Sequence, residues 1–211
     1  ETIKKAGGLH KFINYQSIIF TDCGGFQMSR GVFLKKSKKG LHFRNPYNES
    51  KVVITPKRMM EIQLTLNSDV AMMLDDMSGY EVSKEEAKKA MENTNRWGLE
   101  SLKAHQELKG DSKQLLFGIV QGNFYPDLRK ESAKFIAKQD FDGIAIGGVA
   151  IGEPKEEMHK AVSAAIKHLP ENKPRYVMGV GSPLEILDLV EKGIDCFDSV
   201  HFTRLCRMGE S

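Results

Sequence analysis

Long hydrophobic runs, paired cysteines and metal-ligand clusters are all missing from this sequence of 211 residues. No apolar run approaches the roughly 18–20 residues that cross a bilayer, so we expect no membrane-spanning segment and no membrane partner. The first residues also lack the apolar core of a signal peptide. Three cysteines, Cys23, Cys196 and Cys206, form no CxxC pair. Their odd number favours a reduced, cytoplasmic setting over a disulfide framework.

What the sequence contains is typical of one globular domain, because 40% of it is hydrophobic and 28% is charged. The net charge of +3 hides an asymmetry, since residues 1–58 hold twelve Lys or Arg residues against three acidic ones. The densest run, KKSKK at residues 35–39, has two interpretations. It is either a solvated hairpin tip or a patch that faces phosphates.

Short apolar runs alternate with helical patterns from Asp69 onward. The runs cover residues 70–74, 115–120, 143–146, 175–178 and 195–198, and an earlier run covers 17–20. Helix starts are marked by Thr55-Pro56, by the capping box Ser83–Glu86, and by Pro126, Pro154 and Pro183. Because the runs lack polar alternation, they predict parallel strands that are buried on both faces.

Repeated βα units predict either a closed barrel or a doubly wound open sheet. Six candidate site residues fall at or just after the carboxyl ends of six different runs. They are Asp22, Asp75, Gln121, Gly148, Met178 and Asp198. Barrel enzymes build their sites on that rim from many strands, whereas an open sheet concentrates its site at one switch point. The sequence therefore predicts an α/β fold of the (β/α)8 TIM-barrel type.

About six strands do not close such a barrel. At roughly 30 residues per βα unit, two units are expected upstream. We therefore expect residues 1–211 to be a partial catalytic barrel: a fragment, a split protein, or a longer chain whose outer parts are absent. Residues 30–54 break the alternation and carry hairpin turns, which predicts an antiparallel insertion over the rim.

Six motifs each give weak evidence of function when taken alone, but the set taken together is specific. They are TDCGGFQMS (21–29), LDDM (74–77), FGIVQG (117–122), GIAIGGVAIGEP (143–154), RYVMGVGSP (175–183) and GIDCFDSVHFTRLCRMG (193–209). Their order and spacing resemble those of the tRNA-guanine transglycosylases over essentially the whole chain. Those enzymes replace guanine in tRNA with a 7-deazaguanine without cutting the phosphodiester backbone. The resemblance implies tRNA and a free 7-deazaguanine base as partners, and it leaves a homo- or heterodimer open.

The resemblance assigns the chemistry to two aspartates. Asp198 matches the nucleophile, and a carboxylate there can attack the ribose anomeric carbon to form a covalent intermediate. Asp22 matches the general acid/base that protonates the departing guanine and deprotonates the incoming base. The plainer alternatives are a helix-capping aspartate at 198 and a turn aspartate at 22.

Further positions match base and tRNA contacts. Asp75, Gln121 and the Gly148 backbone match the groups that recognise the base, and Phe26 and Met178 match the pair that sandwiches it. The remaining matches beside the base are Cys23, Met77 and Ile151, and those beside the tRNA are Thr203, Arg204 and Arg207. Outside the family context, Phe26 and Met178 would be core residues and the two arginines would be partners in salt bridges at the rim.

Several positions depart from the family pattern. Cys23 stands where the family usually has Ser, Ser199 where it has Cys, and Phe202 where it has Pro. Asp76-Met77 replaces the common Glu-Cys or Asp-Val. The family's zinc-binding segment would lie beyond residue 211, so we expect no metal or cofactor within these residues. These departures fit an altered base choice or a divergent paralogue.

Three alternative functions stay open. A non-catalytic subunit that only docks tRNA would not need Asp22, Asp75 and Asp198 together. A second alternative is a relative that acts on DNA or on a D-loop guanine. The motifs of this sequence resemble more closely those of the bacterial and eukaryotic type, which modifies the first anticodon position. A metal- or phosphate-dependent barrel lyase would act on small molecules with Mg²⁺ and form no covalent nucleic-acid adduct.

Overall fold

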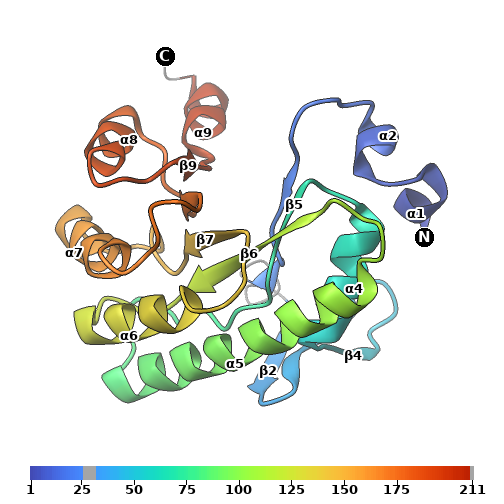
Figure 1. The fold of residues 1–211 in the computed structure, drawn as a ribbon, viewed down its shortest axis with the longest axis horizontal. Coiled ribbons are helices and arrows are strands. Elements are labelled where there is room, and N and C mark those ends of the chain that lie inside the picture. The colour runs from blue at the N-terminus through green and yellow to red at the C-terminus, as the bar shows by residue number, and fades with distance from the viewer. Residues whose placement is uncertain (26–31, 210–211) are drawn as a thin grey trace.

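The computed structural model describes residues 1–25 and 32–209, and its centre is one parallel sheet (Figure 1). The strand order is β1-β5-β6-β7-β8-β9, and every neighbouring pair is parallel. The strands are β1 (Phe20–Thr21), β5 (Val70–Met72), β6 (Leu115–Val120), β7 (Gly143–Ile146), β8 (Arg175–Val177) and β9 (Cys196–Phe197). The prediction of an α/β fold with about six barrel strands is confirmed.

The sheet is curled, as an incomplete barrel requires. The ring of Phe20 on β1 lies 5.8 Å from the ring of Phe117 on β6 and 5.9 Å from that of Tyr176 on β8, centroid to centroid. In a flat sheet, β1 and β8 would be about 19 Å apart at four strand spacings. The contact therefore places all three rings inside one concave face. Gly143 makes room there, because a Cβ would lie 2.3 Å from Phe117 Cζ.

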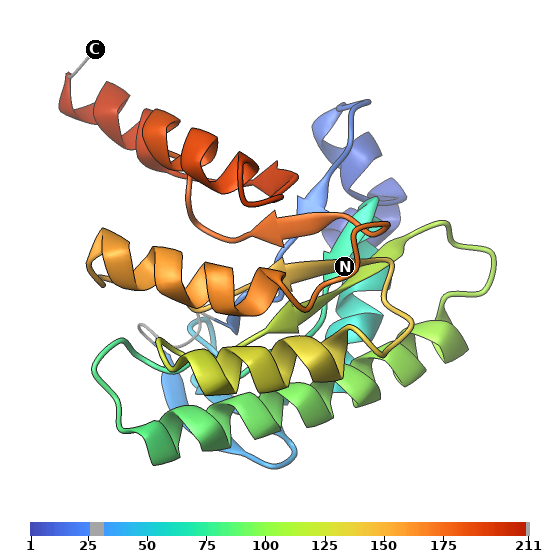
Figure 2. The ribbon, with the colours of Figure 1, turned by 60° about the vertical axis from the view of Figure 1, so that its left-hand side comes forward.

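Helices cover the convex face, and Figure 2 shows α5, α6 and α7 side by side along it. The helices are α1 (Thr2–Ala6), α2 (Leu9–Ile13), α4 (Pro56–Leu66), α5 (Lys84–Leu108), α6 (Pro126–Ile136), α7 (Lys155–Ile166), α8 (Pro183–Val190) and α9 (His201–Met208). The predicted starts are confirmed: Thr55 caps α4 and Ser83 forms the capping box of α5. Among the described residues, no helix combines the length and the apolar character needed to cross a membrane.

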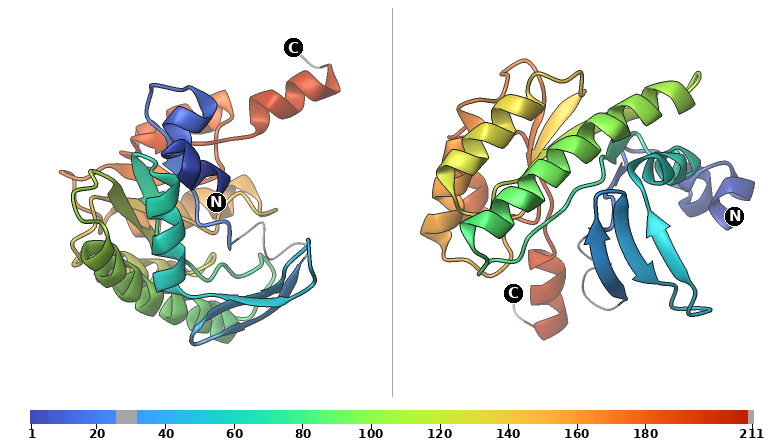
Figure 3. Two further views of the ribbon diagram at one scale, coloured as in Figure 1. Left: turned by 90° about the vertical axis from the view of Figure 1, so that its right-hand side faces the viewer. Right: turned by 90° about the horizontal axis from the view of Figure 1, so that it is seen from below.

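The predicted insertion is a separate antiparallel sheet of three strands beside the main body (Figure 3). Its strands are β2 (Phe33–Ser37), β3 (Gly40–Arg44) and β4 (Lys51–Ile54). The backbone carbonyl of Lys38 at the β2–β3 turn accepts hydrogen bonds from Trp97 and Arg96 on α5. Lys36 forms an ion pair with the buried Asp76. The KKSKK run thus covers the end of β2 and the turn that follows it, and Lys36 is engaged by a carboxylate of the protein.

The earliest strand differs from its predicted bounds. Residues 17–20 were expected to form it, but β1 is only Phe20–Thr21. The reason is local, because the Ile19 N–H donates to the Asp69 carboxylate at 2.7 Å. The Ile19 carbonyl accepts from the N–H groups of both Asp69 and Val70. The bond from Val70 to Ile19 belongs to the ladder between β1 and β5, but the Ile19 N–H is taken by the Asp69 side chain and cannot extend it.

Candidate active site

The six residues predicted for the rim do follow six different strands. Asp22, Gln121, Met178 and Asp198 come directly after β1, β6, β8 and β9, while Asp75 and Gly148 stand slightly beyond β5 and β7. Since the strands are parallel and the sheet is curled, their carboxyl ends share one concave edge. The fold therefore brings together side chains that are up to 176 residues apart.

A cavity of about 340 Å³ opens at this edge. Among the predicted residues, its lining includes Asp22, Asp75, Met77, Gly148, Ile151, Met178, Asp198 and Arg204. Residues that sequence reasoning did not single out also line it, including Tyr176, Val149 and Gly179. A cavity of this size holds a small planar molecule such as a nucleobase.

Asp75 is buried at the inner end of the cavity, with both carboxylate oxygens engaged. Oδ2 accepts a hydrogen bond from Gln121 Nε2 at 2.7 Å, and Oδ1 accepts one from the Cys23 thiol at 3.2 Å. Burial, assisted by the negative charge of Asp22, raises the pKa of Asp75 to about 6. The same burial raises the pKa of the Cys23 thiol well above its usual value, so Cys23 acts as a neutral donor.

Gly148 lies against Gln121 in a conformation that excludes a side chain. Its φ of +63° is in the left-handed region, and a Cβ would lie 2.3 Å from Gln121 Oε1. Glycine is therefore required both by the backbone and by the space. The Gln121 N–H donates to Ser132 Oγ at 3.2 Å, which ties the end of β6 to α6.

Asp198 also lines the cavity and is exposed. Its Oδ1 accepts hydrogen bonds from Tyr176 Oη at 2.5 Å and from the Gly179 N–H at 2.7 Å. Burial and the neighbouring carboxylate raise the pKa of Tyr176, so its hydroxyl remains a donor. Neither bond uses Oδ2, so this oxygen has no protein donor among the described residues.

Asp22 is the third carboxyl group of the cavity. The residue as a whole is exposed, yet the surrounding rim removes much of the water from its carboxyl group. That desolvation is the main cause of its raised pKa, and the negative charge of Asp198 adds to it. The Gly24 N–H donates to Oδ2 at 3.3 Å, while Gln63 Nε2 donates to the backbone carbonyl at 3.1 Å. A carboxyl group in this state is suited to carry a proton.

The loop after β7 is shaped by Glu153. Its two carboxylate oxygens accept from the N–H groups of Ala150 at 2.6 Å and Ile151 at 2.8 Å. This fixes a turn in which Ala150 has a positive φ of 57°. The turn directs Ile151 to the cavity lining.

Some predicted residues lie elsewhere. Cys23 and Gln121 contact Asp75 and are not among the side chains that line the cavity. Thr203 and Arg207 are exposed on α9 outside the lining, although Arg204 on the same helix belongs to it. Phe26 lies outside the described residues.

Sequence reasoning missed three residues that support the site. Tyr176 holds Asp198, Gln63 holds the backbone of Thr21 and Asp22, and Arg129 binds the backbone of the loops after β6 and β7. Tyr176 had a usable signal, because it stands inside a predicted strand two residues before a rim position. Gln63 and Arg129 lie within helices, and their sequence context gives no indication that they reach the sheet.

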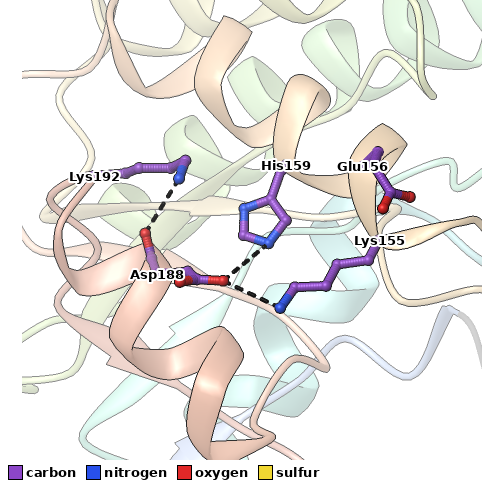
Figure 4. Close-up of a pocket in the computed structure, with 5 residues that line it drawn as sticks. All are labelled: Lys155, Glu156, His159, Asp188 and Lys192. Atoms are coloured by element: carbon purple, nitrogen blue, oxygen red, sulfur yellow. Dashed lines mark hydrogen bonds and ion pairs between the residues drawn. The ribbon is translucent and has the colours of Figure 1, made fainter.

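A second hollow, of about 580 Å³, lies on α7 and α8 and has a different character (Figure 4). The Asp188 carboxylate is 3.1 Å from Lys155 Nζ and 3.7 Å from His159 Nε2, and Lys192 donates to the Asp188 carbonyl. These are exposed or half-exposed ion pairs on outer helices, and none of the predicted site residues lines this hollow. Among the described residues, no cluster of His, Cys, Asp or Glu side chains is arranged to hold a metal ion.

The sequence is similar to a family of known proteins. A family model described as queuine tRNA-ribosyltransferase matches residues 1–211. Curated relatives of that name include those of Bacillus cereus (46% identical), Tolumonas auensis (45%) and Vibrio cholerae (46%), each aligned over 210 residues or 99% of this chain. The alignments cover 55–56% of those proteins, so the chain spans about half of their length. The chain belongs to the queuine tRNA-ribosyltransferase family.

Proposed function

We propose that the protein exchanges a guanine of tRNA, at the first anticodon position, for a free 7-deazaguanine base. The observation that carries this proposal is the sharing of one cavity by Asp22, Asp75 and Asp198. A buried carboxylate with an amide partner suits base recognition, while two accessible carboxyl groups suit displacement at a sugar carbon. A subunit that only docks tRNA would need none of these groups in a cavity.

The reaction runs as two displacements at the ribose anomeric carbon. Asp198 attacks that carbon through the oxygen that has no protein donor, and the carbon–nitrogen bond to guanine breaks. The electron pair leaves with the guanine nitrogen, which takes a proton from Asp22. The incoming base then gives a proton to Asp22 and attacks the same carbon, which releases the Asp198 carboxylate. Covalent catalysis accelerates such a reaction because it replaces one difficult displacement by two easier ones.

Recognition of the base falls to Asp75, Gln121 and the loop at Gly148. A guanine-like base presents ring N–H and amino donors that a carboxylate accepts, and a carbonyl oxygen that amide and backbone N–H groups donate to. Asp75 is ionised above its pKa of about 6, which favours acceptance near neutral pH. Met178 lies at the cavity wall and is half-buried, in keeping with a stacking role.

The base that enters is a small one, 7-aminomethyl- or 7-cyano-7-deazaguanine. Ile151 and Met77 both line the cavity. Ile151 is β-branched and stiff, and its backbone is held by Glu153, so it cannot retreat easily from a bulky substituent. Met77 is more adaptable. The cyclopentenediol of queuine is therefore expected to be poorly accepted.

The tRNA contacts the same rim. Arg204 lines the cavity, and Arg207 and Thr203 lie exposed on the same helix, α9. Arginine is well suited to phosphate contacts, because its planar group donates several hydrogen bonds. A tRNA substrate and a family of intracellular modification enzymes are the basis for proposing a cytoplasmic location.

Replacement of Asp198 tests the proposal. The whole protein is incubated with tRNA and radiolabelled guanine, and label entering the tRNA is counted. Asp198→Asn should reduce incorporation to background while gel-shift affinity for tRNA is kept. Asp195→Asn, on the same segment but outside the cavity lining, is the control and should retain exchange. Undiminished exchange by Asp198→Asn would refute the mechanism.

A further inference from the structure

Arg129 is fully buried near the start of α6, and its guanidinium contacts only backbone carbonyls. Nε donates to Asn123 O at 2.6 Å, Nη1 to Val120 O at 3.1 Å and Gly147 O at 2.7 Å, and Nη2 to Gly148 O at 3.0 Å. Among the described residues, no carboxylate forms an ion pair with it. One side chain thus joins the loops after β6 and β7.

A buried cation with neutral partners is costly to maintain. An apolar side chain of similar volume would fill the same space without removing a charge from water. Burial lowers the pKa of Arg129 to about 9, so the group remains charged near neutral pH. Filling the core therefore does not account for an arginine here. The property that an apolar residue cannot supply is a planar fork that holds carbonyls of two loops at once.

The carbonyls that Arg129 holds fix the direction of two N–H groups. In a trans peptide the N–H points away from the carbonyl oxygen of the same unit, and the described backbone contains no cis peptide. The Gly147 carbonyl faces Arg129, so the Gly148 N–H points to the other side. The Gly148 carbonyl does the same for the Val149 N–H.

That other side is the cavity, because Gly147, Gly148 and Val149 all belong to its lining. Within the described parts of the chain, neither the Gly148 N–H nor the Val149 N–H has a hydrogen-bond acceptor. Buried N–H groups are nearly always paired, so two unpaired donors at a cavity wall indicate a ligand that carries an acceptor.

We infer that Arg129 is a positioning residue of the base site, which aims the Gly148 and Val149 N–H groups at a carbonyl oxygen of the bound base. It touches neither the base nor the reacting atoms. The ligand chemistry that this arrangement selects is a purine-like base with an oxo group on the edge that faces the loop. The inference rests on the proposed function for the identity of the ligand as a base.

The test compares guanine with 2-aminopurine, which lacks the oxo group and also the N1 hydrogen that guanine can donate to Asp75. Binding of fluorescent 2-aminopurine to the whole protein is measured directly, and guanine is measured by displacement, both without tRNA. The unmutated protein should prefer guanine by roughly 3- to 10-fold for each hydrogen bond to the oxygen. Arg129→Lys keeps the charge but loses the fork, so this preference should fall by that factor, while the part of it that comes from the N1–H should remain. Lys130→Met, on the exposed side of the same helix, is the matched control and should keep it.

The preference is a ratio of two affinities, so a general loosening of the cavity lowers both and leaves it unchanged. Equal binding of the two bases by the unmutated protein would overturn the inference, even if Arg129→Lys fails to fold. So would an Arg129→Lys protein with the original preference. Preference for guanine that depends on Arg129, combined with no exchange into tRNA, would refute only the proposed function.

Discussion

The ends of β5, β6 and β7 carry buried polar groups, whereas the ends of β1, β8 and β9 carry exposed carboxylates or half-buried side chains. Asp75 is 9% exposed and Gln121 is 2% exposed, and each contacts the other. Asp22 and Asp198 are exposed and line the same cavity. The first group follows strands with a neighbour on both sides, and the two exposed aspartates follow the edge strands of the described sheet.

In the proposed function, this difference separates recognition of the base from the reaction at the sugar. Buried polar groups must satisfy one another, so Asp75, Gln121 and the Gly148 loop are held in fixed geometry before any ligand arrives. Asp22 and Asp198 keep contact with solvent, so the proposed reaction has them where a ribose attached to a long polymer would reach them. A change on the reactive side should affect rate with little effect on folding, and a change on the buried side should affect both.

The largest effect is expected from Asp22→Asn. Loss of the proton carrier should slow exchange by about 10²–10⁴-fold, the usual contribution of a general acid/base group. The melting temperature should not fall, because desolvation raises the pKa of the Asp22 carboxyl group and asparagine carries no charge there. Initial rates of guanine incorporation and a thermal melt measure the two sides of this prediction. Asp111→Asn, at an exposed position before β6, provides the control, and a loss of rate in both variants would remove the assignment.

Asp75→Asn should act on stability as well as on base binding. The folded-state pKa of Asp75, about 6, lies above its ordinary value of 3.8, so the carboxylate destabilises the fold as pH rises through this interval. Asparagine removes this charge penalty, which is on the order of 3 kcal/mol at pH 7.5, but it leaves one of the donors Gln121 and Cys23 without an acceptor. The charge penalty should shrink to about half by pH 5. The stability of the variant relative to the unmutated protein should therefore increase from pH 5 to pH 7.5.

Urea unfolding at the two pH values measures this change. Asp188→Asn is the control, and its stability change with pH should have the opposite sign. Lys155 lowers the pKa of Asp188, so the Asp188 carboxylate stabilises the fold at pH values above its unfolded-state pKa. That variant should be slightly less stable than the unmutated protein at pH 7.5, with the difference disappearing in acid. A stability change for Asp75→Asn that does not depend on pH would show that the carboxyl group is not strained by burial.

A smaller effect is expected from Ile151→Gly. Overpacking against Ile151 should cost a bulky base about 1–3 kcal/mol, or roughly 10- to 200-fold in relative use. The glycine variant should therefore gain queuine use by that factor while retaining the small base. Ile151→Val is the matched control and should stay selective. Competition of each free base against labelled guanine in tRNA gives the ratio, and efficient queuine use by the unmutated protein would contradict the prediction.

The two regions also differ in how far the sequence predicts them. Each rim residue could be located because a strand with an unbroken apolar run ends just before it, as LLFGIV does before Gln121. Pairing across the cavity could not be read in the same way. Gln63 and Arg129 donate hydrogen bonds to backbone carbonyls of residues distant in the chain. Every residue has a backbone carbonyl, so the sequence does not show which of them a side chain will contact. The short β1 was mispredicted because the Asp69 side chain, far along the chain, takes the Ile19 N–H.

The central claim is that Asp198 forms the covalent bond to ribose, and the most direct measurement is to map the adduct. The whole protein is incubated with tRNA in the absence of an incoming base and then denatured. After nuclease and protease digestion, the modified peptide is sequenced by mass spectrometry. The account predicts one ribose-linked peptide, with the modification on Asp198. A modification on Asp22, or turnover without any protein–tRNA adduct, would contradict it.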